Sequence, residues 1–505
     1  MLPDQDELAQ AISSPVSAVS ATVELINAET PYLLDTTGVC LPFEGNLHFL
    51  STEPSLPPSV LPDIVQNLSP FSDSLLDDTL ILTGNEYHAL YHYQNEFILD
   101  RLLKTPGWST YSCILHNISH SPMPMHFLLA LSSLDLTRRS SGTVHAAETS
   151  QRHLLRGSEL LKQTMSLETS PDQASTLISW LLLYLCATHR ESINWEAANR
   201  VSQTALDYLK RHILDAFRST SRSRGYSCNT FTSKESASTF QESICLIARL
   251  TTFLILTDWF TSFEGCGGHI SRYLASEEHL YWSIFALQED FLEQFWGASY
   301  PERELVQDVE VSSIVRAGHK VLLLIQEVHD LSYGLSTRVN CVDLKSKIIQ
   351  LDTTYSSVTR LARSPMMLGS QLHEYAGIVL AFMNFARIYH FRVAETGNPT
   401  TPPEIVAAMM EIMETAHRTF SSSSRRGFNL LELPLFMLGL ESKDSIHREW
   451  ILQRLPTSRY RLAMERIVTL QQQTNRRVSI AEMREFLRDP SRVVSPQQEL
   501  GLHMV

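Results

Sequence analysis

Two histidine pairs have the spacing that comes nearest to a metal site in this chain. His88 and His92 are four residues apart, and His116 and His120 repeat that spacing. On a helix this spacing places both rings on one face, as in many zinc sites. Neither pair has the glutamate of an HExxH motif or a third ligand fixed beside it. We therefore expect no metal and no bound cofactor, and favour surface or capping roles.

Adjacent carboxylates are a second arrangement that could do chemistry, as an acid and a base. They occur as Asp77-Asp78, Glu277-Glu278 and Glu289-Asp290. Neighbours on a helix point about 100° apart, so they do not form an acid/base pair by themselves. The chain also has no GxxxxGK[ST] loop and no GxSxG turn. The one glycine cluster, Gly265 to Gly268, lacks a preceding strand and predicts a turn between helices.

A third group of ionisable residues lies in LPLFMLGLESKDSIHREWILQRL, from Leu433 to Leu455. Asp444 or Ser445 is expected to cap a helix that begins near Ile446. The expected core-facing stripe of that helix consists of Ile446, Trp450, Ile451 and Leu455. His447-Arg448-Glu449 then becomes a polar face beside a buried tryptophan. We predict a structural module here, and no catalytic residue anywhere in the chain.

The seven cysteines are scattered, and the closest two are Cys228 and Cys245. That spacing excludes a CxxC redox or zinc motif, and an odd number does not suggest a disulfide framework. We expect most of them to be buried thiols that pack as small apolar groups.

Charge is distributed very unevenly along the chain. The first 100 residues contain fifteen acidic and no basic residues, so their net charge is −15. The remaining residues carry +1, which gives the total of −14. Such a segment repels phosphate backbones and is a poor candidate for contacting DNA. Residues 1–83 are also rich in Ser and Pro, and we expect them to be flexible. Two interpretations are open for this tract: an acidic activation segment, or a solvated linker.

From Asn85 onward the apolar period is that of helices, which predicts an all-α fold. Expected helices cover 86–104, 125–139, 144–167, 192–217, 240–260, 279–296, 302–331, 342–360, 372–395 and 403–420, with shorter ones between 430 and 487. Another is expected to start at the Ser170-Pro171-Asp172-Gln173 box, with Pro at the first helical position. The predicted division is an acidic segment 1–83, a helical domain 84–490 with an exposed Ser/Arg loop at about 218–238, and a tail 491–505.

No segment predicts a membrane span or a signal peptide. The longest apolar stretch, Leu177 to Ala187, is well short of the roughly 20 residues that a span requires. The N-terminus, MLPDQDELAQ, lacks a cationic region. We expect a cytosolic or nuclear protein that does not contact membranes.

Three stretches of the chain resemble parts of a known family. MHFLLALSSLDLTRR (Met125 to Arg139), LAFMNFARIYHFRV (Leu380 to Val393) and the Leu433–Leu455 stretch follow one another in the order seen in the fungal-specific transcription factor domain. That domain is the helical regulatory region C-terminal to zinc binuclear cluster DNA-binding domains. The resemblance implies an all-helical fold, a nuclear location and control of transcription, often of metabolic or secondary-metabolite genes.

The sequence departs from that family in one respect. A zinc cluster needs six cysteines in two CxxC-x6-C halves, whereas the first 100 residues contain only Cys40. Direct, sequence-specific DNA binding is therefore not expected. Either the cluster is missing from a truncated member, or the protein acts through other transcription factors or coregulators.

Two other functions are open at this point: a helical scaffold or dimerisation protein, and an uncharacterised helical enzyme. The helix expected from Ser458 to Gln473, with Leu462, Ile467 and Leu470 near one side, could meet a second copy of the chain. Packing inside the same chain is the simpler interpretation. Lys210-Arg211 with Arg218, Arg222 and Arg224 resembles a loose bipartite nuclear signal, and a solvated Ser/Arg loop explains the same residues.

Overall fold

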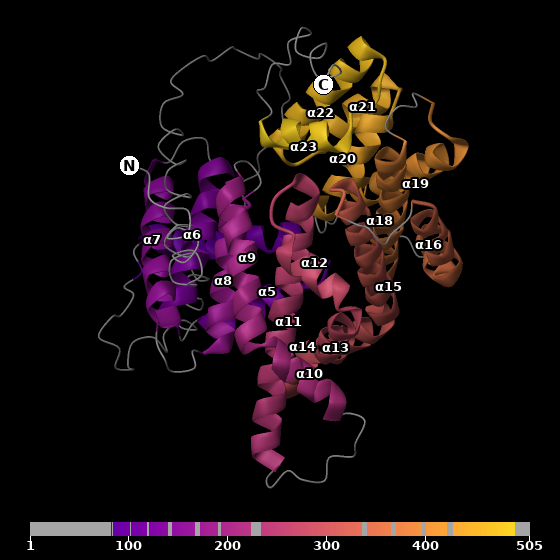
Figure 1. Ribbon diagram of the computed structural model, residues 1–505. Coiled ribbons are helices and arrows are strands. Elements are labelled where there is room, and N and C mark those ends of the chain that lie inside the picture. Colours follow the sequence, from indigo (N-terminus) through magenta and orange to yellow (C-terminus); the bar gives the residue numbers. More distant parts are fainter. Residues whose placement is uncertain are drawn as a thin grey trace, which may run out of the picture.

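The computed structural model confirms an all-α fold, because every regular element among the described residues is helical (Figure 1). The structure describes Leu82 and residues 84–101, 103–118, 121–139, 144–166, 172–189, 193–223, 234–335, 341–364, 370–395, 400–421 and 428–489. The predicted acidic segment, apart from Leu82, and the predicted tail lie outside these residues.

The helices fall into three consecutive sets. The first contains α4 (Gly84–His92), α5 (Thr110–Ile118), α6 (Pro122–Arg139), α7 (Val144–Ser166), α8 (Gln173–Ala187), α9 (Trp195–His212) and α10 (Leu214–Ser223). The second contains α11 (Lys234–Glu264), α12 (His269–Ser276), α13 (Glu278–Gln288), α14 (Phe291–Trp296) and α15 (Glu302–Ser332). The third contains α16 (Cys341–Thr354), α17 (Ser356–Arg363), α18 (Gln371–Ala394), α19 (Pro403–Ser421), α20 (Glu432–Glu441), α21 (Ser445–Leu452), α22 (Ser458–Thr474) and α23 (Ile480–Arg488).

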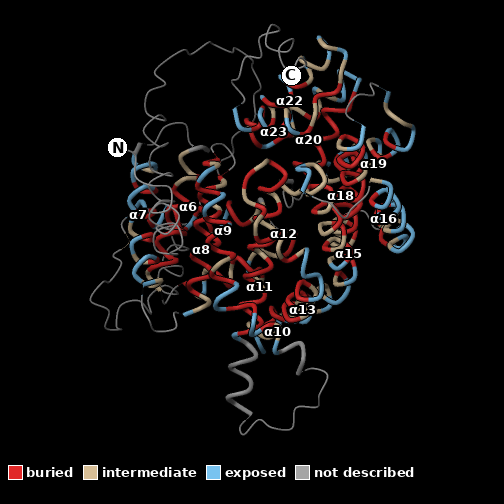
Figure 2. The backbone as a smooth tube through the Cα atoms, in the orientation of Figure 1, coloured by how far each residue is buried: buried red, intermediate tan, exposed pale blue. Residues whose placement is uncertain are grey.

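Helix α11 belongs to both apolar cores of the molecule. Residues from Ile244 to Ile255 pack into a core shared with α5 to α9, while Trp259 and Phe263 pack into a core shared with α15 and α18 to α23. In Figure 1 the two sets of helices lie on either side of α11, and Figure 2 shows the buried residues gathered along their facing surfaces. The segment Ser243–Glu264 is long and apolar enough to cross a membrane, but 72% of it is buried inside the protein. Packing in two cores accounts for that composition.

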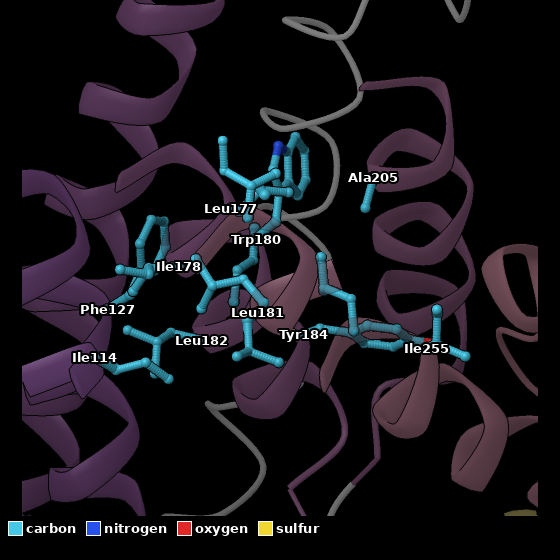
Figure 3. Close-up of a cluster of buried hydrophobic side chains, with 14 of the residues drawn as sticks. Ile114, Phe127, Leu177, Ile178, Trp180, Leu181, Leu182, Tyr184, Ala205 and Ile255 are labelled. Carbon is cyan, nitrogen blue, oxygen red and sulfur yellow. The ribbon is translucent and has the colours of Figure 1, made fainter. Parts of the chain in front are cut away.

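Helix α8 forms the centre of the first core. Figure 3 shows its side chains between Phe127 of α6 and Ala205 of α9. The helix begins at Gln173, and the Asp172 carboxylate caps it by accepting the Ala174 N–H at 3.1 Å. The predicted start, with Pro171 as the first helical residue, is therefore wrong, because the side chain that caps the helix follows the proline.

The glycine cluster forms the turn between α11 and α12, as predicted, and it is organised by one buried carboxylate. Asp258 accepts hydrogen bonds from the backbone N–H groups of Gly268 at 2.8 Å and Ser271 at 2.7 Å. It also accepts from the hydroxyls of Tyr184, at 2.7 Å, and Ser202. The first N–H groups of a helix have no partner within it. Here a residue one turn back in α11 supplies that partner, and α8 and α9 are tied to the same point.

Only glycine fits at two positions of this turn. Gly267 and Gly268 have φ angles of 63° and 78°, which L-residues with side chains rarely adopt. A Cβ at Gly267 would lie 2.1 Å from the Tyr184 hydroxyl, and one at Gly268 would lie 2.6 Å from the Ser262 hydroxyl. The glycines therefore allow the backbone to approach the Asp258 network closely.

Several expected boundaries differ from the structure. The helix expected over 86–104 ends at His92 and continues as a π-helical segment, Tyr93–Phe97, which buries both aromatic rings in a stacked pair. Expected helices 192–217, 279–296 and 342–360 each divide in two, at Ile213, at Glu289-Asp290 and at Tyr355. Most other boundaries agree within three residues, which is the usual uncertainty at helix ends.

The predicted Ser/Arg loop at 218–238 is too long. Helix α10 extends to Ser223 and α11 already begins at Lys234, so helix covers both ends of the predicted loop. Residues 224–233 lie outside the described part of the chain. Adding residues to an existing helix is far easier than starting one, so polar sequence can continue a helix whose apolar period has ended.

Replacing Gly267 by alanine is expected to lower the free energy of unfolding by about 3 kcal/mol or more, because the methyl group collides with the Tyr184 hydroxyl in a left-handed backbone. Gly84→Ala is the matched control: nothing lies within 4 Å of its Cβ position. It should leave stability unchanged or raise it by up to about 1 kcal/mol. Urea unfolding of both variants measures the difference, and equal stabilities would contradict the role given to the turn.

Candidate functional site

The described histidines of the two pairs singled out in the sequence lie in different surroundings. His88 is exposed, whereas His92 is buried, and its Nε2 lies 2.8 Å from Asp135 Oδ2. His116 packs edge-on against the Phe295 ring, and His120 lies outside the described residues. Within the described part of the chain, no group of three or more His, Cys, Asp or Glu side chains could hold a metal ion.

Asp135 on α6 lies between two buried imidazoles. His92 of α4 contacts Oδ2, and His189, which follows α8, contacts Oδ1 at 3.2 Å. Hydrogen bonds from these histidines keep the pKa of Asp135 far below its ordinary value, against the effect of burial. A carboxylate that remains ionised between two rings is suited to joining three segments, and less suited to accepting a proton.

A second buried group joins α4, α6 and α7. The Glu86 carboxylate lies 2.9 Å from His153 Nε2 and accepts a hydrogen bond from Arg152 at 2.7 Å. His153 Nδ1 lies 2.7 Å from His126 Nδ1, so one of the two rings donates to the other. Burial lowers the pKa of both histidines, that of His126 to about 4. Both rings are neutral near pH 7, and the chain of contacts holds the short helix α4 in place.

The carboxylate pairs do not converge either. Glu278 pairs with Lys320, Glu289 pairs with Arg316 at 3.1 Å, and Glu277 is exposed. Asp77 and Asp78 lie outside the described residues. In each described pair, one carboxylate is held by a basic side chain from α15.

The stretch from Leu433 to Leu455 forms most of α20 and all of α21, and the predicted cap is present. Asp444 caps α21 by accepting the Ile446 N–H at 2.8 Å, and Ile451 and Leu455 are buried. The predicted stripe is wrong at Ile446, which is 74% exposed because it occupies the first turn, before α21 reaches the core. Trp450 is only half-buried, stacking on His417 with the Arg454 guanidinium over its ring.

A buried ion network joins α18, α20 and the segment before α23. Glu441 lies 3.1 Å from Arg392 Nη1 and 3.1 Å from Arg477 Nη2, and all three side chains are buried. Arg392 also donates to the Val478 carbonyl at 2.8 Å. The Glu441 carboxylate is therefore needed to stabilise both buried guanidinium groups, because a buried charge without a partner is very unfavourable.

A cavity of about 810 Å³ lies between α16, α17, α18 and α19. Its floor is apolar, formed by Ile348, Leu380, Phe391, Ile405 and Ala408. In Figure 1, α16 lies at the outer edge of the molecule beside α18. A volume of this size, with an apolar lining and a few polar groups, is typical of small-molecule sites.

Ion pairs cross this cavity at both ends. Lys345 of α16 lies 3.7 Å from Glu404 of α19, and both side chains are exposed. At the other end Arg363 of α17 pairs with Glu411 of α19, whose second oxygen accepts a hydrogen bond from Asn384 at 2.8 Å. The walls of the cavity are therefore held together by side chains.

The remaining polar groups of the cavity are concentrated near α17. Arg387 of α18 pairs with Asp352 of α16. Arg360 lines the cavity, is exposed and pairs with none of the described residues. The hydroxyl of the neighbouring Thr359 is buried and has no hydrogen-bond partner in the described chain.

One sequence feature is related to this cavity, an apolar pair on α16. Val342 and Ile349, seven residues apart on α16, are apolar but 67% and 58% exposed, and both line the opening. Their spacing is that of one helix face, yet both stay more than half exposed within the described part of the chain. The periodicity alone does not distinguish such a face from an ordinary core contact.

The buried histidines predict that the protein loses stability as the pH falls below about 6.5. Burial lowers the pKa of His126 to about 4 and that of His319 to about 3. In this range the unfolded chain binds more protons than the folded chain, so the free energy of unfolding decreases with decreasing pH. For His319 alone the loss is about 2 kcal/mol at about pH 5. Urea unfolding across this range, with His319→Phe removing one titrating group, should show a pH dependence reduced by about one proton. If the His319→Phe variant kept the same pH dependence of the free energy of unfolding, the contribution given to His319 would be contradicted.

Breaking the ion network at Glu441 is expected to destabilise the protein strongly. Glu441→Gln leaves Arg392 and Arg477 without their carboxylate, and the expected loss is about 3 kcal/mol. Glu404→Gln, which removes the exposed partner of Lys345, is the control and should cost less than about 1 kcal/mol. Thermal and urea unfolding compare the two variants, and similar losses would refute the distinction.

Comparison with known families agrees with the resemblance carried by the three stretches. The model of the fungal-specific transcription factor domain matches residues 90–470. This range contains all three stretches, most of both apolar cores and the cavity beside α16. No curated protein and no solved structure matches the chain. Because the match covers well over half of its length, the chain belongs to the fungal-specific transcription factor domain family.

Proposed function

We propose that the protein regulates transcription in the nucleus, through contacts with other transcription factors or coregulators, and that its targets form a metabolic or secondary-metabolite gene set. Membership of the transcription factor domain family over residues 90–470 carries this proposal. The family supports a role in transcription in general, and its members act in the nucleus. The choice of partners and target genes goes beyond that membership.

Action through protein partners is supported by charge. The first 100 residues contain fifteen acidic and no basic residues, so they are repelled by the phosphates of DNA. The acidic residues alternate in sequence with Leu and Phe residues, which is the composition of an acidic activation segment. Such a segment would recruit a coregulator.

A regulatory role also agrees with how the ionisable groups are used. Asp135, Glu86 and Glu441 each join two or more helices, and in each case the bonded partners are histidine or arginine side chains. Such groups stabilise packing between helices and leave little capacity for transferring protons to a substrate. This arrangement favours a non-enzymatic protein.

The scaffold or dimerisation alternative is less well supported. On α22, Ile467 is completely buried and Leu470 is half-buried, whereas Leu462 is 47% exposed. Most of the apolar stripe of this helix therefore packs inside the chain. A second copy of the chain would find only the edge of the stripe.

Fusing the whole chain to a heterologous DNA-binding domain tests the proposal. We expect the fusion to change transcription of a reporter severalfold, and chromatin occupancy of the tagged protein to be enriched at its target genes. Neutralising Asp73, Asp77 and Asp78 with asparagine should weaken an activating effect, because these acids flank Leu75 and Leu76 in the sequence of the proposed activation segment.

The matched control neutralises three acids of the helical domain, Glu302, Glu310 and Asp343, which are all exposed. It removes the same charge and should leave the reporter unchanged. A fusion that is silent, together with no chromatin enrichment, would reject the proposed function. Equal effects of the two triple variants would reject the role of the acidic segment alone.

A further inference from the structure

We propose that the cavity between α16, α17, α18 and α19 binds a small, elongated and mainly apolar molecule that ends in a carboxylate. Binding of this molecule does not depend on the role in transcription. Its use as a signal that alters transcription would rest on the proposed function.

The shape of the cavity suits an extended apolar body. Its lining on α18 runs from Leu380 to Glu395, which corresponds to a length of roughly 20 Å along a helix. Ile348, Phe391 and Ile405 form a buried floor, and Val342 and Ile349 extend it to the rim. An apolar chain or fused ring system lying along α18 would remove this surface from water.

The ion pairs across the cavity favour a small molecule over a helix from a partner protein. A helix with its side chains is about 10 Å wide, and inserting one would break both the Arg363–Glu411 and the Lys345–Glu404 pairs. A slender molecule can enter at the Lys345 end alone, since that pair is exposed and easily separated. Glu411 is held by both Arg363 and Asn384, so the other end stays closed.

The end of the cavity near α17 carries an excess of positive charge. Three guanidinium groups line it, those of Arg360, Arg363 and Arg387, against two carboxylates, Asp352 and Glu411. Both carboxylates are already paired, which leaves Arg360 as the cation without a partner among the described residues. A carboxylate on the ligand would complete this set of charges, because arginine matches its geometry with two parallel hydrogen bonds.

The Thr359 hydroxyl supports the same position for the carboxylate. It is buried without a hydrogen bond in the described chain and is adjacent to Arg360. Thr359 and Arg360 both line the cavity, so this hydroxyl is one of its polar groups. Buried polar atoms normally find a partner, so an unsatisfied hydroxyl on a cavity wall points to a polar group of a ligand.

The opposite end differs in charge. There Lys345 is paired with Glu404, Glu395 adds a second acid, and the His390 ring bonds to the Cys341 carbonyl at 3.0 Å. Burial lowers the pKa of His390, so its ring is neutral. This end therefore does not attract a carboxylate, and the ligand is expected to bind in one direction.

Calorimetric titration of the full chain with three probes of equal length tests the proposal: dodecanoate, dodecanol and dodecylamine, each below its micelle-forming concentration. We expect one dodecanoate per chain, bound roughly tenfold more tightly than either other probe. Arg360→Gln should reduce this preference to near parity. Arg303→Gln removes an equal charge from an exposed position that does not line the cavity, and should change nothing.

A second pair of variants places the bound probe in the cavity. Ala407 is exposed on α19 and lines the opening, so Ala407→Trp fills the space without disturbing the core and should abolish binding. Met410, on the same helix, is 68% exposed and does not line the cavity, so Met410→Trp should bind normally. Circular dichroism confirms that both variants fold.

Three results would overturn the inference: equal binding of dodecanoate and dodecanol, unchanged binding by Ala407→Trp, or no binding of any probe. The last result would assign the cavity to another occupant, such as a helix of a partner protein. None of these measurements involves DNA or a reporter gene. Their failure is therefore distinct from a failure of the proposed function.

Discussion

The carboxylate of Asp258 is the interaction on which the arrangement of the helices depends. It is completely buried at the point where α11 leaves one apolar core and enters the other, and it accepts hydrogen bonds from α8, α9 and the start of α12. A buried charge is tolerated only when its hydrogen-bonding capacity is satisfied, and here four donors converge on it. The same bonds replace the side-chain cap that α12 lacks, because its N-cap residue is Gly268. One group thereby fixes the turn, the helix that follows and two helices from the first core.

Much of this fold could be predicted from the sequence because helices can be recognised by the periodic spacing of their apolar residues. Segments such as 302–331 and 403–420 match α15 and α19 closely, since each has a long regular stripe and a proline at its start. Apolar periodicity gave wrong predictions where tertiary packing determined the backbone conformation or the exposure of a side chain. Tyr93 and Phe97 became buried through a π-helical segment, and Ile446 follows the stripe of α21 yet faces solvent. The position of a residue within a helix is set by the local sequence, whereas its burial depends on which other helices pack against that position.

The candidate site could not be predicted in the same way. Its lining comes from four helices, and the polar groups that give it a direction, Arg360 and Thr359, are unremarkable in sequence. Histidines drew attention first, because spacing of metal ligands can be recognised along a chain. In the structure His92 bonds to a carboxylate from another segment, and so do His153 and His189, which belong to neither of the two histidine pairs. Contacts between side chains that are far apart in the sequence cannot be predicted from any one segment of it.

The links between the end of α11 and the C-terminal helices have a consequence for how the protein is made. Glu264 receives hydrogen bonds from Arg459 and Tyr460 of α22, and the Phe263 carbonyl receives one from Arg484 of α23. These partners are about 200 residues further along the chain, so they leave the ribosome long after α11 does. Until then the end of α11 lacks its partners in α22 and α23, although α15 and α18, which pack on Trp259 and Phe263, have already been made. Completion of the second core is therefore a late event in biosynthesis, because α22 and α23 are made after every other helix that packs in it.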